Sequence, residues 1–73
     1  MKKTTEYVVR WLTTENNDIV FNNFKTFSRL EADMKVDECK ANNYSGYLLE
    51  VKKVESEEFP QCNKTTEETI KIW

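Results

Sequence analysis

The sequence predicts a small α+β fold: a four-stranded antiparallel sheet, in the order β-β-α-β-β along the chain, with one helix packed on one face. The stretch 27–43 carries a helix start signal and apolar residues at helical spacing. The stretches on both sides of it alternate β-branched or aromatic residues with polar ones, which is typical of half-buried strands. Consecutive strands joined by a tight turn or by one helix favour an antiparallel sheet covered on one side.

The first two strands are predicted to form a hairpin. Residues 4–13 are rich in β-branched and aromatic side chains, and residues 19–23 repeat this pattern. Between them, 14–18 contains Asn and Asp, which accept the left-handed conformation of tight turns. The pair Asn22-Asn23 is expected to end the second strand.

The helix has a clear predicted start. Ser28 followed by Glu31 fits a capping box, in which the Ser hydroxyl accepts from the amide of the third helical residue and the Glu carboxylate accepts from the Ser amide. Lys40 lies in the last turn, where the helix dipole favours a cation. Asn42 and Asn43 follow and can take the left-handed conformation that ends many helices.

The helix carries two apolar stripes on opposite sides, at about 100° per residue. We expect the first stripe, Leu30, Met34 and Ala41, to pack on the sheet. The second stripe is Ala32, Val36 and Cys39. It is interpreted either as part of an ordinary mixed surface or as a contact with a partner or a second copy.

Two further strands are predicted after the helix. Residues 44–54 form the third strand and 66–73 the fourth, with a loop at 55–65. Phe59 is the one large apolar residue of that loop, and it either closes the edge of the core or stands out as an anchor.

Strand alternation assigns residues to the two sheet faces. The face under the helix is expected to carry Tyr7, Val9, Trp11, Ile19, Phe21, Tyr47, Leu49, Val51, Ile70 and Ile72. The open face is expected to carry Val8, Leu12, Val20, Leu48, Val54 and Trp73, diluted by Arg10, Glu50, Lys52 and Lys71. An open face this apolar is a candidate binding surface.

The composition argues against catalysis and metal binding. The chain has no His and a single Gly, so it lacks an imidazole base and a glycine-rich phosphate loop. Two widely separated cysteines, Cys39 and Cys62, do not form a zinc set, and both are expected to be reduced. We therefore expect a protein that is not an enzyme and uses no metal or cofactor. Its 73 residues form one domain, 1–73.

The sequence also favours a cytoplasmic protein, since it has no apolar leader and no membrane-length apolar run. A net charge of −2 makes nucleic-acid binding, including single-strand binding by aromatic stacking, a weak hypothesis.

The leading hypothesis is a small interaction protein that binds another protein through an open sheet face or a strand edge. The short chain, poor in Gly, Pro and His and rich in Asn, Lys, Glu and Thr, is typical of accessory proteins of phages and mobile elements, which favours an inhibitor of a host enzyme or defence system. The predicted partner-binding residues are Trp73, Trp11, Tyr44, Phe59 and Val36.

The alternative hypothesis is a homo-oligomer, most simply a dimer, that captures a small nucleotide-like ligand at its subunit interface. Aromatic rings and Asn side chains would hold the base. The predicted ligand-binding cations are Arg10, Arg29 and Lys71.

Overall fold

The computed structural model describes residues 2–73, so the first residue of the predicted domain lies outside the described range. The fold class is confirmed: the chain forms a four-stranded antiparallel sheet and one helix, in the order β-β-α-β-β, with a short 3-10 helix in the loop before the last strand. The elements are β1 (Lys2–Glu15), β2 (Asp18–Thr26), α1 (Arg29–Ala41), β3 (Ser45–Glu55), η1 (Pro60–Cys62) and β4 (Lys64–Ile72).

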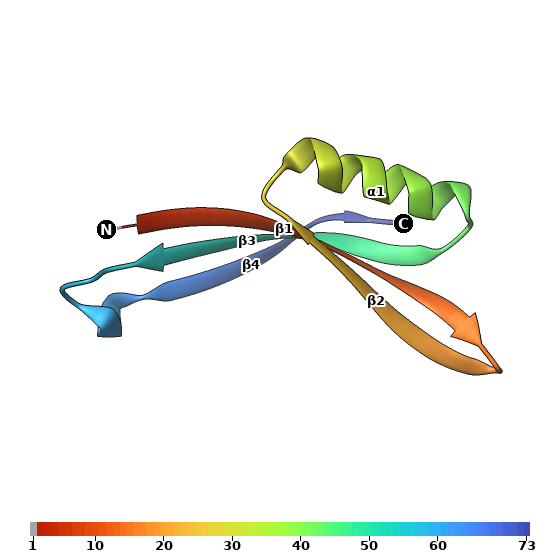
Figure 1. Cartoon of the computed structure of the whole chain (residues 1–73), viewed down its shortest axis with the longest axis horizontal. Helices are drawn as coiled ribbons and strands as arrows, with labels where there is room; N and C mark the ends of the chain where they lie inside the picture. The colour runs from red at the N-terminus through yellow and green to blue at the C-terminus, as the bar shows by residue number, and fades with distance from the viewer. Residues whose placement is uncertain (1) are drawn as a thin grey trace.

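The strands lie in the order β2-β1-β3-β4, so the two longest strands occupy the centre of the sheet. The molecule is elongated, measuring 48 × 26 × 15 Å. Figure 1 shows that α1 lies over only one end of the sheet, while the start of β1 and the β3–β4 hairpin extend beyond it. One end of the molecule is therefore two layers thick, and the other end is a bare sheet.

The β1–β2 hairpin closes through a two-residue turn. Asn16 and Asn17 have φ angles of 51° and 68°, and Glu15 pairs with Asp18. Two positive φ angles in a two-residue loop are the signature of a type I′ turn, whose twist suits a hairpin. The strand after the turn runs to Thr26 rather than ending at Asn23 as predicted. It continues because Phe24 packs against the core.

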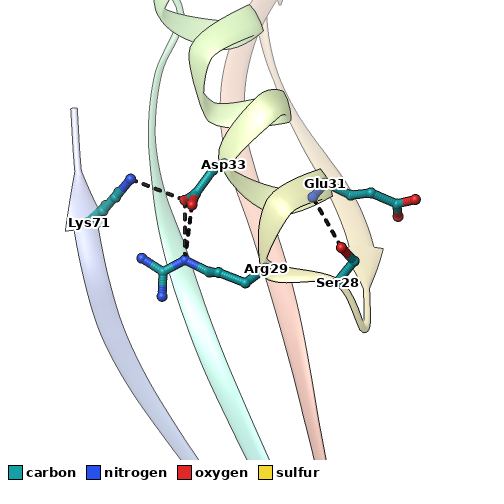
Figure 2. A network of polar contacts seen from close by, with 5 residues as sticks. All are labelled: Ser28, Arg29, Glu31, Asp33 and Lys71. Carbon is teal, nitrogen blue, oxygen red and sulfur yellow. Dashed lines mark hydrogen bonds and ion pairs between the residues drawn. The ribbon is translucent and has the colours of Figure 1, made fainter.

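The helix begins as predicted, but one half of the capping box is different. The Glu31 amide donates to Ser28 Oγ at 3.3 Å, which Figure 2 shows. The Glu31 carboxylate does not accept from the Ser28 amide. It accepts from the hydroxyl of Thr26 at 2.7 Å, and the Ser28 amide donates to that same hydroxyl at 3.0 Å. The Thr26 hydroxyl thus lies between the Ser28 amide and the Glu31 carboxylate, and it joins the end of β2 to the first turn of α1.

The predicted orientation of the helix is wrong. The stripe of Ala32, Val36 and Cys39 is buried, with Val36 0% exposed, whereas Leu30 and Met34 are 70% and 63% exposed. The core cluster under the helix joins this stripe to Val9 and Leu48, with Tyr7, Trp11, Phe24, Ile70 and Trp73 packed around it. Because the sheet supplies the large side chains, the helix fits closely only with small ones. Val36 is therefore a core residue, and the prediction that it binds a partner is wrong.

The sheet faces are also partly different from the prediction. Val9 pairs with Phe24 on one side and Leu48 on the other, so these residues share the helix face. Tyr7, Val9 and Trp11 do lie under the helix, as expected. Leu49 and Val51 instead form a small buried cluster with Val8 on the opposite face. Alternation within β1, β2 and β3 was correct, but it cannot say which side of the strand faces the helix.

A β-bulge changes the end of β4. Leu48 pairs with Lys71 and Leu49 pairs with Thr69, which leaves Ile70 without a direct partner. One extra residue reverses the alternation beyond it. Ile70 packs on the core as predicted, but so does Trp73, and Ile72 is 80% exposed. The expected positions of Ile72 and Trp73 are therefore exchanged.

The orientation of α1 predicts losses of stability of different size for two helix substitutions. Val36→Ala should lower the free energy of unfolding by about 1–3 kcal/mol, because it removes buried methyl groups and leaves a cavity. Leu30→Ala should cost less than about 0.5 kcal/mol, since the side chain is exposed. Urea unfolding followed by circular dichroism measures both. A larger loss for Leu30→Ala would mean that the helix packs through its other stripe.

Candidate functional site

The open face of the sheet, opposite α1, carries two neighbouring rows of side chains that cross the strands. In the first row, Arg10 pairs with Asn23 of β2 and with Tyr47 of β3, and Tyr47 pairs with Ile72 of β4. In the second row, Leu12 pairs with Phe21 and with Ser45. All four strands therefore contribute to one surface.

Arg10 ties the first row together. Its Nε donates to Asn23 Oδ1 at 3.0 Å, and its Nη1 donates to Tyr47 Oη at 3.3 Å. The hydrogen bond with Tyr47 is the main cause that raises the pKa of Arg10, so the guanidinium stays charged at any physiological pH. These bonds use only part of its five N–H donors, and the rest can meet an acceptor on a bound molecule.

The two rows enclose a hollow of about 310 Å3. Leu12, Phe21, Tyr47 and Ile72 give it apolar walls, while Arg10 and Asn23 lie at its polar side. The small residues Ser45 and Gly46 also line it. A side chain on Gly46 is not tolerated in this position, because its Cβ would lie 2.1 Å from the Arg10 carbonyl oxygen and 2.8 Å from the Trp11 Cα.

The walls of the hollow are unusually exposed for apolar residues. Phe21 is 77% and Ile72 80% exposed, and Leu12 and Tyr47 are also exposed. Single exposed apolar residues are common, but a contiguous group around a concavity marks a binding surface. We therefore identify these side chains, with Arg10 and Asn23, as the candidate site and call it the open-face hollow.

The two tryptophans predicted to bind a partner border this hollow but are held by the core. Trp11 and Trp73 line the hollow, and both pack against the cluster under α1. The backbone of Trp73 pairs with Gly46 through hydrogen bonds of 3.0 and 3.1 Å. Its indole Nε1 is buried and has no hydrogen-bond acceptor among the described residues, so packing alone holds the ring. Trp73 is thus not the exposed anchor on the open face that the alternation predicted.

The other predicted partner-binding residues are not gathered at this site. Tyr44 is exposed in the turn between α1 and β3 and does not line the hollow. Phe59 is exposed in the β3–β4 loop, which Figure 1 shows at the end of the sheet farthest from α1. Its backbone amide donates to Ser56 Oγ within the loop, and its exposed side chain does not cover the core.

Nor do the three predicted ligand-binding cations form one site. Figure 2 shows Arg29 and Lys71 converging on the carboxylate of Asp33. Arg29 Nε lies 3.2 Å and Lys71 Nζ 3.1 Å from Asp33 Oδ1. This cluster ties β4 to α1 on the helix side of the sheet, whereas Arg10 lies on the open face. The three cations therefore cannot meet one phosphate group.

Other reactive groups are isolated. Burial raises the pKa of the Cys39 thiol, which keeps it protonated in the core, and Cys62 is exposed and unpaired. Within residues 2–73, no three His, Cys, Asp or Glu side chains are grouped so as to hold a metal ion. In the same range, no helix is long and apolar enough to cross a membrane.

Most residues of the open-face hollow were missed because their faces depend on strand register. One signal in the sequence could have located part of it. A two-residue turn at Asn16-Asn17 makes Glu15 pair with Asp18, and counting back from that pair places Leu12 opposite Phe21. No comparable signal reveals the bulge that turns Ile72 outward.

Comparison with known proteins adds no information: no protein-family model, curated protein or solved structure matches the chain. The function must therefore be inferred from the site itself.

The Asp33 cluster predicts a small pH dependence of stability. The hydrogen bond from Lys71 and then those from Arg29 lower the pKa of Asp33 in the folded state. A lowered folded pKa stabilises the fold above the unfolded value, about 3.9, and this contribution is lost as the pH falls through the folded value. The side chain is 36% exposed, so solvent screening keeps the effect within about 1 kcal/mol.

Asp33→Asn should therefore lower the free energy of unfolding at pH 7, and the difference from the wild type should shrink as the pH falls through the folded pKa of Asp33. Urea titrations at pH 7 and at a series of acidic pH values measure it. Asp37→Asn is the matched control, because no ion pair of the described residues includes Asp37. Equal losses for both variants at pH 7 would show that the cluster does not tie β4 to α1.

Proposed function

We propose that this protein is a small non-enzymatic binding protein that holds a protein partner at the open-face hollow. The single observation that supports it is the group of exposed apolar side chains, Leu12, Phe21, Tyr47 and Ile72, around a concavity on one sheet face. Covering apolar surface is favourable by about 25 cal/mol per Å2, so a partner that fills the hollow gains most from these residues.

The chemistry of the hollow indicates which partner groups fit. An aliphatic or aromatic side chain can enter between the rings of Phe21 and Tyr47 and the side chain of Ile72. A neighbouring carboxylate on the partner can accept the free donors of Arg10. Arg and Tyr are enriched among the residues that dominate protein interfaces, and a polar group beside an apolar pocket fixes orientation.

Binding on the face is better supported than binding at a strand edge. The free edges of the sheet are β2 and β4. A strand added to either edge would gain backbone hydrogen bonds but would leave the walls of the hollow in water. Docking on the face removes this apolar surface from water directly.

Inhibition of a host enzyme or defence system, suggested by the composition, is the mode of action we propose for such a protein. With no catalytic group at the hollow, the protein would act by occupying its partner's surface. The identity of the captured partner tests this mode of action.

Capture of a small ligand is the second candidate function. A volume of about 310 Å3 is at the lower end of small-molecule sites, about 300–1,000 Å3. Arg10 is the one cation at the hollow, because Arg29 and Lys71 are engaged on the other side of the sheet. An apolar carboxylate therefore fits this site better than the nucleotide-like ligand first expected.

Serine substitutions on the open face should weaken partner capture without unfolding the protein. Phe21→Ser and Ile72→Ser each remove an exposed wall, and each should weaken capture from host-cell lysate by about tenfold or more, as expected for a central interface residue. Phe59→Ser is the matched control, since it removes an exposed apolar residue of the β3–β4 loop that does not line the hollow. Quantitative mass spectrometry of the captured proteins measures the ratio.

Native mass spectrometry of the purified protein distinguishes the two candidate functions. An added mass below about 500 Da that is lost in Ile72→Ser would favour the small ligand. Equal capture by the wild type and by both open-face variants would remove the open-face hollow as the binding site.

A further inference from the structure

The outer face of α1 carries a second exposed apolar surface. Phe27, Leu30 and Met34 are all more than 60% exposed. Leu30 and Met34 are one helical turn apart on the same face of α1, and Phe27 lies just before the helix start. We call these three residues the helix stripe. It belongs to the layer opposite the open-face hollow, so it is independent of the function proposed above.

The helix stripe is bordered by carboxylates. Glu31 and Glu38 are seven residues apart and lie two turns from each other along one side of it. Asp37 lies on the other side, and no ion pair among the described residues includes Asp37 or Glu31. One oxygen of Glu31 accepts from Thr26, which leaves its other oxygen available.

A hollow of about 300 Å3 lies beside Met34, between the two glutamates. Phe24 and Met34 supply its apolar part, and Glu31, Lys35 and Glu38 complete it. Lys35 neutralises only part of the negative charge of Glu31 and Glu38. Its Nζ lies 5.1 Å from the centre of the Trp11 ring and 5.5 Å from that of Phe24, and its 3.4 Å contact engages only one oxygen of Glu38.

These observations point to one occupant. We propose that the helix stripe docks a basic amphipathic segment of a protein partner. Apolar residues of that segment would cover Leu30, Met34 and Phe27. A Lys or Arg of the segment would lay its aliphatic stem against Phe24 and Met34 and place its cationic end between Glu31 and Glu38.

The charges disfavour the other occupants. A second copy of this chain would bring a further Glu31, Asp37 and Glu38 to the stripe, and like charges that meet there are unfavourable. Anionic lipid surfaces and nucleic acid are repelled for the same reason, since both attract basic rather than acidic segments. With a partner on each layer, the protein would bridge two molecules through opposite sides of one sheet.

The test uses a fluorescent helical peptide of about 18 residues, with leucines at i, i+3, i+4 and i+7 and lysines elsewhere. A matched peptide carries glutamates in place of the lysines. Fluorescence anisotropy at about 0.15 M salt measures binding to the full chain. We expect the lysine peptide to bind at least about tenfold more tightly than the glutamate peptide, because only the former complements the rim.

Two sets of variants separate the apolar and the charged contributions. Leu30→Ser with Met34→Ser, and separately Asp37→Asn with Glu38→Gln, should each weaken binding of the lysine peptide by about fivefold or more. Phe21→Ser and Ile72→Ser on the open face should leave it unchanged. This pattern differs from that of the open-face experiment, so either proposal can fail alone.

Several results would overturn the inference. These are unchanged peptide binding in the Leu30→Ser, Met34→Ser variant, equal binding of both peptides, or no binding of the lysine peptide. Sedimentation that shows a dimer in the wild type and a monomer in Leu30→Ser would assign the stripe to a second copy. Binding to phosphatidylserine vesicles that is lost in the same variant would assign it to a membrane surface.

Discussion

The close contact between the small residues of α1 and the centre of the sheet determines how every other surface is presented. Ala32, Val36 and Cys39 meet Val9 and Leu48 in the core. Small side chains allow the helix to approach the large residues of the sheet at native packing density. The consequence is that the larger helix residues, Leu30 and Met34, must face outward. The helix stripe is thus a product of how the core is filled.

The open-face hollow depends on two local features of the sheet. Gly46 lets β1 and β3 approach more closely than a residue with a Cβ could, and it lines the hollow together with Ser45. The bulge at Ile70 then turns Ile72 to the open face and Trp73 to the core. Without the bulge, the alternation would place Trp73 on the open face and Ile72 under the helix.

The two surfaces carry charges of opposite sign. The open-face hollow presents an arginine beside apolar walls, and the helix stripe presents carboxylates beside apolar side chains. A near-neutral chain with a net charge of −2 can therefore carry two surfaces of opposite preference. Because they lie on opposite layers, partners at the two surfaces would not compete for the same residues.

The sequence by itself determined the elements and their order, because turn chemistry, helix capping and alternation are local properties. Ser28 marks the helix start, and Asn16 and Asn17 mark the hairpin turn. Alternation likewise placed Arg10 on the open face of the sheet. Only the tertiary structure decided which face of each element is buried. Both helix stripes are apolar, so the choice between Leu30 and Val36 rests on the volume that the sheet leaves for the helix. Register and the bulge at Ile70 are contacts between strands, and no single strand encodes them.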